Sequence, residues 1–184
     1  MKQLTDVSLA KDALLAGGLI VAKTDTIYGI LARAVDPDAV SKLYLAKNRN
    51  PQKSCIILVS DLDHIPGLSA SHKDFYLDLL RERPTTIVLL VADDFLPHLK
   101  RQDKTLAFRL VKNSPLAELI NSTGPLIAPS ANIEGHESAT NIGQAIDYFG
   151  DLVDIYVDGG TIINNIPSKI IAINDDDEIE VIRD

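Results

Sequence analysis

Hydroxyl side chains crowd residues 24–29, which read Thr-Asp-Thr-Ile-Tyr-Gly and follow an apolar run that predicts a buried strand over residues 18–22. In an extended chain, Thr24, Thr26 and Tyr28 would share one face, because side chains alternate with period two. The closing glycine leaves room for a close approach to the backbone. Threonine and tyrosine are also common in strands, so this stretch alone fits an ordinary strand better than a hydrogen-bonding site.

A local basic patch occupies residues 39–60, which contain no acidic residue. Its basic residues are Lys42, Lys47, Arg49 and Lys53. A helix is expected to end near Lys47, which places Lys47 and Arg49 where they could point into a site. Such a patch suits a small polyanion such as a nucleotide better than a long nucleic acid, which needs a broad basic face. Cations at a helix C-terminus also suit the helix dipole.

Further polar side chains fall at the ends of predicted strands, namely Arg109, Ser130, Asn132 and Ser168. Ligands of open α/β sheets bind where such ends gather, although Ser-Ala-Asn could also be only a turn. The sequence has no Walker loop, no GxGxxG and no GxSxG elbow. The four histidines show no metal-ligand spacing, and no histidine–acid pair is placed to activate Ser130.

The elements that position these residues predict a single α/β (α+β) domain over residues 1–184, with a twisted mixed sheet between two layers of helices and a concave cleft. Helices are expected over residues 7–16, 37–47, 71–80, 94–100, 115–121 and 141–149. Strands are expected over residues 18–22, 54–59, 86–91, 105–110, 125–128, 155–157, 170–173 and 179–182. An acidic turn over residues 175–178 is expected to join the last two strands.

Composition limits the class of protein. The net charge of −8 divides into +2 for residues 1–109 (15 basic, 13 acidic) and −10 for residues 110–184 (3 basic, 13 acidic). With 46% hydrophobic and 5% aromatic residues, the core is expected to be aliphatic. A lone Cys55 inside a predicted strand excludes a disulfide framework and argues against a catalytic thiol. With no membrane span or secretory signal in the sequence, a cytoplasmic protein is expected.

Taken together and in order, the motifs resemble those of the YrdC/Sua5 family over roughly residues 9–183. The matching motifs are residues 24–29, Lys47-Asn48-Arg49 with Lys53, Ser130-Ala131-Asn132 with Gly135, Asp158-Gly159-Gly160, and Pro167-Ser168. The length is similar to the short bacterial, TsaC-type form. The chain departs from the family pattern at Lys23, Glu82-Arg83, Glu134 and Lys169.

The resemblance implies an L-threonylcarbamoyladenylate synthase, which joins L-threonine, bicarbonate and ATP and releases pyrophosphate. Its product serves the t6A modification at position 37 of tRNA through downstream threonylcarbamoyl-transfer proteins. The nucleophile comes from the substrate, so no protein nucleophile is expected. Mg²⁺ would arrive on the ATP phosphates, and neither an organic cofactor nor a protein-held metal is expected.

The same resemblance assigns residues to substrates. The residues implied for ATP are Lys47, Arg49, Lys53, Thr105, Ser130, Asn132, Ser138 and Arg183. Those implied for threonine are Thr26, Arg109 and Ser168. Tyr28 is expected to shape the wall, whereas Thr24 and Asp25 would only set the turn.

Two other readings follow from the same resemblance. A double-stranded RNA or ribosomal RNA binder without synthase activity would use the basic patch, but the −10 balance of the second half opposes broad backbone binding. A carbamoyl-transfer domain like that of hydrogenase-maturation proteins would be accompanied by zinc-finger and acylphosphatase segments, which the sequence lacks.

Overall fold

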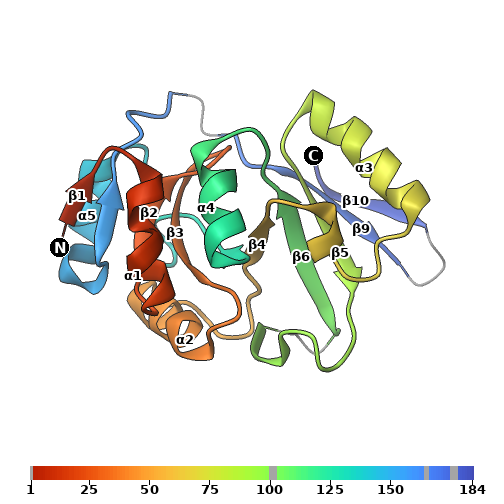
Figure 1. Cartoon of the computed structure of the whole chain (residues 1–184), viewed down its shortest axis with the longest axis horizontal. Coiled ribbons are helices and arrows are strands. Elements are labelled where there is room, and N and C mark those ends of the chain that lie inside the picture. Colours follow the sequence, from red (N-terminus) through yellow and green to blue (C-terminus); the bar gives the residue numbers. More distant parts are fainter. Residues whose placement is uncertain (1, 100–102, 164–165, 175–177) are drawn as a thin grey trace.

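The computed structural model describes residues 2–99, 103–163, 166–174 and 178–184. Within these residues, ten strands form one open, mixed sheet in the order β1-β8-β2-β3-β7-β4-β6-β5-β9-β10 (Figure 1). In chain order the strands are β1 Lys2–Leu4, β2 Ile20–Lys23, β3 Tyr28–Arg33, β4 Ile56–Val59, β5 Thr85–Leu90, β6 Thr105–Leu110, β7 Leu126–Ile127, β8 Ile155–Val157, β9 Lys169–Ile173 and β10 Ile179–Arg183. Pairing is parallel for β1/β8, β2/β8, β4/β6 and β5/β9, and antiparallel for the other neighbours.

Helices cover both faces of this sheet (Figure 1). The α-helices are α1 Lys11–Leu15, α2 Pro37–Ala46, α3 Ala70–Glu82, α4 Pro115–Thr123 and α5 Ile142–Phe149. Short 3-10 helices are η1 Val7–Ala10, η2 Leu62–His64, η3 Pro97–Leu99 and η4 Gly150–Leu152. No helix among the described residues is both long and apolar enough to cross a membrane.

The central strands are buried on both sides, and successive side chains divide between two hydrophobic clusters. In β2, Ile20 and Ala22 pack in the cluster that includes α1 and α4, whereas Val21 packs in the cluster that includes α2 and α5. In β4, Leu58 joins the first cluster and Ile57 the second. Because each strand contributes to two cores, it reads as a continuous apolar run rather than as an alternating pattern.

Local signals place several helix starts where the sequence predicts them. Asp36 caps α2 by accepting from the backbone N–H groups of Asp38 (3.1 Å) and Ala39 (3.0 Å), with proline at the first helical position. Ser114 caps α4 in the same way, and Asn141 caps α5. A capping oxygen satisfies N–H groups that have no partner inside the helix.

Other sequence predictions were wrong in detail. Strand β1 was missed because a three-residue edge strand carries no periodic signal, and β3 was also absent from the expected strands. The helix expected over residues 7–16 is divided into η1 and α1. The helix expected over residues 71–80 begins one residue earlier and ends two residues later, with Ser69 as its cap. The helix expected over residues 94–100 is only the 3-10 turn η3 in its described part. Of the acidic turn expected at residues 175–178, residues 175–177 lie outside the described residues.

Candidate active-site cleft

A cleft of about 550 Å³ gathers most of the residues that the sequence singled out. Eight of the eleven candidates line it: Thr26, Arg49, Thr105, Arg109, Ser130, Ser138, Ser168 and Arg183. They come from the turn before β3, from the loop after α2, from β6 and β10, and from the loops after β7 and before β9. Segments far apart in the chain therefore supply hydroxyl and guanidinium groups to one concave surface.

The shared hydroxyl face expected over residues 24–28 holds for Thr24 and Thr26, whose hydroxyl oxygens lie 3.2 Å apart, but does not extend to Tyr28. Thr24 closes a tight turn: its N–H donates to Ile27 O (2.9 Å), and its hydroxyl donates to the same oxygen (2.8 Å). That hydroxyl also accepts from the N–H groups of Thr26 (3.2 Å) and Ile27 (3.3 Å). A threonine hydroxyl can replace strand hydrogen bonds in this way, so the backbone is folded rather than extended.

Tyr28 is not among the residues that line the cleft, and it serves as a structural support. Its hydroxyl donates to Gly160 O (2.8 Å) and accepts from Gly159 N (2.8 Å), and the residue is fully buried. Burial raises the pKa of Tyr28. The tyrosine therefore fixes the loop after β8.

Gly29 allows the chain after β7 to lie against β3. A Cβ at this position would sit 3.3 Å from Thr24 Cγ2 and 3.4 Å from Pro129 O. Hydrogen bonds from Ile30 N to Pro129 O (3.1 Å) and from Ala131 N to Tyr28 O (2.8 Å) join the two segments. This contact carries Ser130 to the cleft.

Lys47 lies beneath the cleft wall, among the loop carbonyls, and is only 1% exposed. Its ammonium donates to Asn132 O (2.5 Å) and to Ser130 O. Ser130 in turn donates to the side-chain oxygen of Asn132 (2.5 Å). Burial, and then the nearby charge of Arg49, lower the pKa of Lys47 to about 8. Lys47 thus fixes the Ser-Ala-Asn loop from below.

Arg49 and Lys53 have different environments. Arg49 lines the cleft and donates to Ser54 O (2.7 Å), and its buried Nε has no hydrogen-bond partner in the part of the chain that the structure describes. Lys53 forms an ion pair with Glu134 outside the cleft, with its side chain 57% exposed. Glu134 also accepts from Asn50 N (2.7 Å). Of the two, only Arg49 lines the cleft.

The basic patch is mostly engaged within the protein. Lys42 donates to Gly17 O (3.2 Å), Lys47 to loop carbonyls and Arg49 to Ser54 O, while Lys53 pairs with Glu134. These contacts leave no broad row of free cations of the kind that nucleic-acid backbones require.

Arg109 and Ser168 form the opposite side of the cleft. Arg109, on β6, is 3% exposed, and its Nη2 lies 3.0 Å from Asp25 Oδ1. Ser168 shares a buried hydrogen bond with Thr86 (2.8 Å), and its carbonyl accepts from Arg183 Nη2 (2.7 Å). The last strand therefore closes the cleft through Arg183.

Thr105 lines the cleft with its hydroxyl engaged, since it donates to Asp103 Oδ1 (2.9 Å). Cys55, expected inside a strand, instead precedes β4 and lines the cleft. Burial raises the pKa of its thiol, which keeps the sulfur protonated and a poor nucleophile.

Sequence reasoning missed Asp25, and the signal lay inside the motif that it singled out. The carboxylate pairs with Arg109, 84 positions away, instead of only setting the turn. No pattern of spacing links two residues so far apart. An acidic residue between two cleft-facing threonines was the one available hint.

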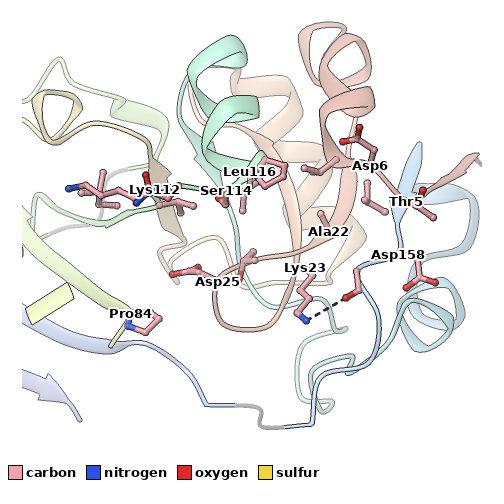
Figure 2. Close-up of a pocket in the computed structure, with 18 of the residues that line it drawn as sticks. Thr5, Asp6, Ala22, Lys23, Asp25, Pro84, Lys112, Ser114, Leu116 and Asp158 are labelled. Atoms are coloured by element: carbon pink, nitrogen blue, oxygen red, sulfur yellow. Dashed lines mark hydrogen bonds between the residues drawn. The ribbon is translucent and has the colours of Figure 1, made fainter. Parts of the chain in front are cut away.

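The residues that depart from the family pattern do not line the cleft. Lys23 packs on Gly159 and donates to its carbonyl (3.4 Å) (Figure 2). Lys169 and Arg83 both approach the carboxylate of Asp184, at 3.4 and 3.6 Å.

A second cavity, a groove of about 770 Å³, shares Thr24 with the cleft (Figure 2). It lies at the ends of β2, β6 and β8 and at the start of α4, and none of the eleven candidates lines it. Figure 2 shows Asp25 and Lys23 on its wall, with Asp158 beyond them.

Comparison with known proteins supplies the family context. A family model described as "Telomere recombination", Sua5/YciO/YrdC, matches residues 12–184. Threonylcarbamoyl-AMP synthase of Marinobacter nauticus is 29% identical over 172 residues, or 91% of this chain and 90% of the relative. The enzyme of the same name from Bacillus subtilis is 32% identical over 171 residues, or 89% of this chain and 49% of the relative.

The fold is shared with a solved structure, that of Pyrococcus abyssi Sua5 complexed with L-threonine. The two have a TM-score of 0.80 at 24% identity, over 93% of this chain and 53% of that chain. The chain thus spans about half of the length of the Bacillus subtilis and Pyrococcus abyssi proteins.

Proposed function

This chain belongs to the Sua5/YciO/YrdC family, and from that membership we propose that it is an L-threonylcarbamoyladenylate synthase. It joins L-threonine, bicarbonate and ATP into threonylcarbamoyl-AMP and releases pyrophosphate. The observation that carries the proposal is the cleft of about 550 Å³, which combines hydroxyl and guanidinium groups suited to an amino acid and a nucleotide.

The chemistry follows from the charges of the substrates. The amine of threonine takes up bicarbonate with loss of water, and an oxygen of the resulting carbamate attacks the α-phosphorus of ATP. The bond from that phosphorus to the bridging oxygen of the β-phosphate breaks, and pyrophosphate leaves. Carbamate and triphosphate are both anions, so positioning and cationic groups are what this cleft must supply.

For threonine, the proposal assigns three residues. Arg109 pairs with the carboxylate, since a guanidinium matches its two oxygens. Thr26 and Ser168 line the same cleft and supply hydroxyl groups for the remainder of the amino acid. The threonine complex of Pyrococcus abyssi Sua5 shows that this fold accepts the amino acid in that protein.

For ATP, the proposal assigns Arg49 to the phosphates, because its buried Nε has no partner among the described residues. Ser130 and Asn132 act at the reacting phosphate and carbamate, and Lys47 holds both while adding positive charge from beneath the loop. Nucleotide contacts from Thr105, Ser138 and Arg183 complete the assignment. Lys53 contacts ATP at the rim of the cleft, and this contact competes with the ion pair between Lys53 and Glu134.

Mg²⁺ is expected to accompany ATP rather than to bind a site on the protein. No group of three or more His, Cys, Asp or Glu residues that could hold a metal occurs within the described ranges. Asp103 is the carboxylate that lines the cleft, and it already accepts from Thr105. The ion would therefore be held mainly by phosphate oxygens and water.

The setting of this reaction is also part of the proposal. Residues 1–184 act as one YrdC-like domain in the cytoplasm, and the product passes to proteins that transfer the threonylcarbamoyl group to tRNA.

The proposal is tested by incubating the protein with ATP, Mg²⁺, bicarbonate and threonine and measuring pyrophosphate and the adenylate by mass spectrometry. Both products should form only when all substrates are present. Absence of both products, together with no calorimetric binding of ATP or threonine, would refute the synthase activity.

A further inference from the structure

The Arg109 guanidinium is a buried charge with one described ion-pair partner. It is 3% exposed, and the carboxylate of Asp25 lies 3.0 Å from its Nη2. Burial lowers the pKa of Arg109, and the negative charge of Asp25 opposes that effect. A buried charge requires such compensation because its hydration is lost.

Part of the same guanidinium remains available to a ligand. Its buried Nε has no hydrogen-bond partner among the described residues, and the residue lines the cleft. A buried N–H group without an acceptor is unfavourable, and an entering carboxylate would satisfy it. Asp25 thus occupies one nitrogen of the fork while a second nitrogen stays free.

Asp25 does not line the cleft. It lines the groove on the wall shown in Figure 2, and its side chain is 25% exposed. It therefore reaches a ligand in the cleft only through Arg109.

The turn that holds Asp25 is itself fixed. The hydroxyl of Thr24 accepts from Thr26 N (3.2 Å) and donates to Ile27 O (2.8 Å), so it fixes the two residues that follow Asp25. The next residue, Thr26, lines the cleft. One turn therefore sets two positions: that of Thr26, which lines the cleft, and that of Asp25, which pairs with Arg109.

We propose that Asp25 is a positioning residue that orients Arg109 and thereby gives the cleft its preference for the carboxylate of threonine. This role rests on the proposed function, because it concerns the amino-acid half of the same site. When the carboxylate of Asp25 is removed, Arg109 keeps its charge, but its free N–H groups are no longer held in one direction. Carboxylate recognition then weakens, whereas the ATP side is untouched.

Calorimetry with Asp25→Asn tests this role, using L-threonine, L-threoninamide and ATP as separate ligands. Threonine affinity should fall about tenfold or more, ATP affinity should change less than twofold, and the preference for threonine over the amide should shrink. Asp25→Glu should give an intermediate threonine affinity. In an Arg109→Lys background, Asp25→Asn should add little further loss.

The matched control is Asp6→Asn. Asp6 lines the same groove, and its carboxylate accepts from Ser8 N (2.9 Å) at the start of η1. This variant should bind threonine like the wild type. If Asp25→Asn does not fold by circular dichroism, Asp25→Glu decides: reduced threonine affinity supports the role, and wild-type affinity overturns it.

The outcomes separate the two claims. A wild-type protein that binds threonine, with Asp25→Asn binding it equally well and with the same preference over the amide, overturns the positioning role alone. Equal losses for threonine and ATP also overturn it, since they indicate general damage. A wild-type protein that neither binds threonine nor forms the adenylate overturns both claims.

Discussion

The ammonium of Lys47 lies 2.5 Å from the main-chain oxygen of Asn132, in a site where the lysine is almost completely buried. The same ammonium donates to Ser130 O. A charge placed there has two effects: it fixes the loop of residues 130–132, and it makes the conformation of that loop depend on the protonation of one lysine.

Replacement of Lys47 by methionine should separate the two substrates. The change keeps the volume but removes the ammonium that donates to Asn132 O and leaves Ser130 O with only the N–H of Asn132, which should lower the free energy of unfolding by about 1–3 kcal/mol. ATP affinity should fall about tenfold or more, with threonine affinity within about threefold. Calorimetry and urea unfolding measure both effects. Lys42→Met is the control, because Lys42 is exposed, and equal losses for both substrates would contradict the assignment.

ATP affinity should also depend on pH through Lys47. Its pKa, lowered by burial to about 8, means that the folded protein loses this charge at a pH where an ordinary lysine keeps it. Affinity should therefore be constant below this pH and fall by up to about tenfold per unit above it. Calorimetric titrations with ATP from about pH 6.5 to 9.5 test this dependence. The Lys47→Met variant should bind ATP weakly, with an affinity that does not change with pH. The same slope in both proteins would contradict the role of the lysine.

Arg49 and Lys53 should not be equivalent, although they stand four positions apart in the same patch. Arg49→Ala removes a cleft-lining donor with an unpartnered Nε and should weaken ATP binding about tenfold to a hundredfold. Lys53→Ala breaks an exposed ion pair with Glu134 and should change ATP affinity less than threefold and stability by less than about 1 kcal/mol. Similar losses of ATP affinity in both variants would show that Lys53 reaches the phosphates.

Tyr28→Phe should affect folding more than substrate binding. The variant leaves Gly159 N and Gly160 O without the hydroxyl that joins them, which should cost about 1–3 kcal/mol of unfolding free energy. Threonine affinity should stay within about threefold of the wild type, because Tyr28 does not line the cleft. Urea unfolding measures the stability, and calorimetry measures the threonine affinity. A large loss of threonine affinity with unchanged stability would show that Tyr28 contacts the substrate.

The sequence predicted the features that depend on neighbours in the chain. Asp36, Ser114 and Asn141 cap the helices that follow them because a cap needs only the next two or three N–H groups. The central strand β6 was predicted with its bounds because it is buried on both faces and its sequence is mostly apolar. The three-residue edge strand β1, which has neither signal, was missed.

The contacts that shape the site lie beyond what such patterns can indicate. The residues of the 24–28 stretch were identified, but the hydroxyl of Thr24 turns the chain and sends Tyr28 to the loop after β8. Lys47 was expected at phosphates and instead meets carbonyls 83 and 85 positions away. Asp25 and Arg109 pair across 84 positions. Residue types could be chosen from the sequence, whereas their partners required the fold.

The origin of the carbamoyl carbon tests the central claim most directly. The protein is incubated with ATP, Mg²⁺, threonine and carbon-13 bicarbonate, and the nucleotide product is analysed by mass spectrometry beside the Arg109→Ala variant. The wild type should form threonylcarbamoyl-AMP that carries the label, with pyrophosphate in equal amount, and the variant should form little of either. The synthase assignment would be contradicted by a folded wild-type protein that forms no labelled adenylate and binds neither ATP nor threonine in calorimetry.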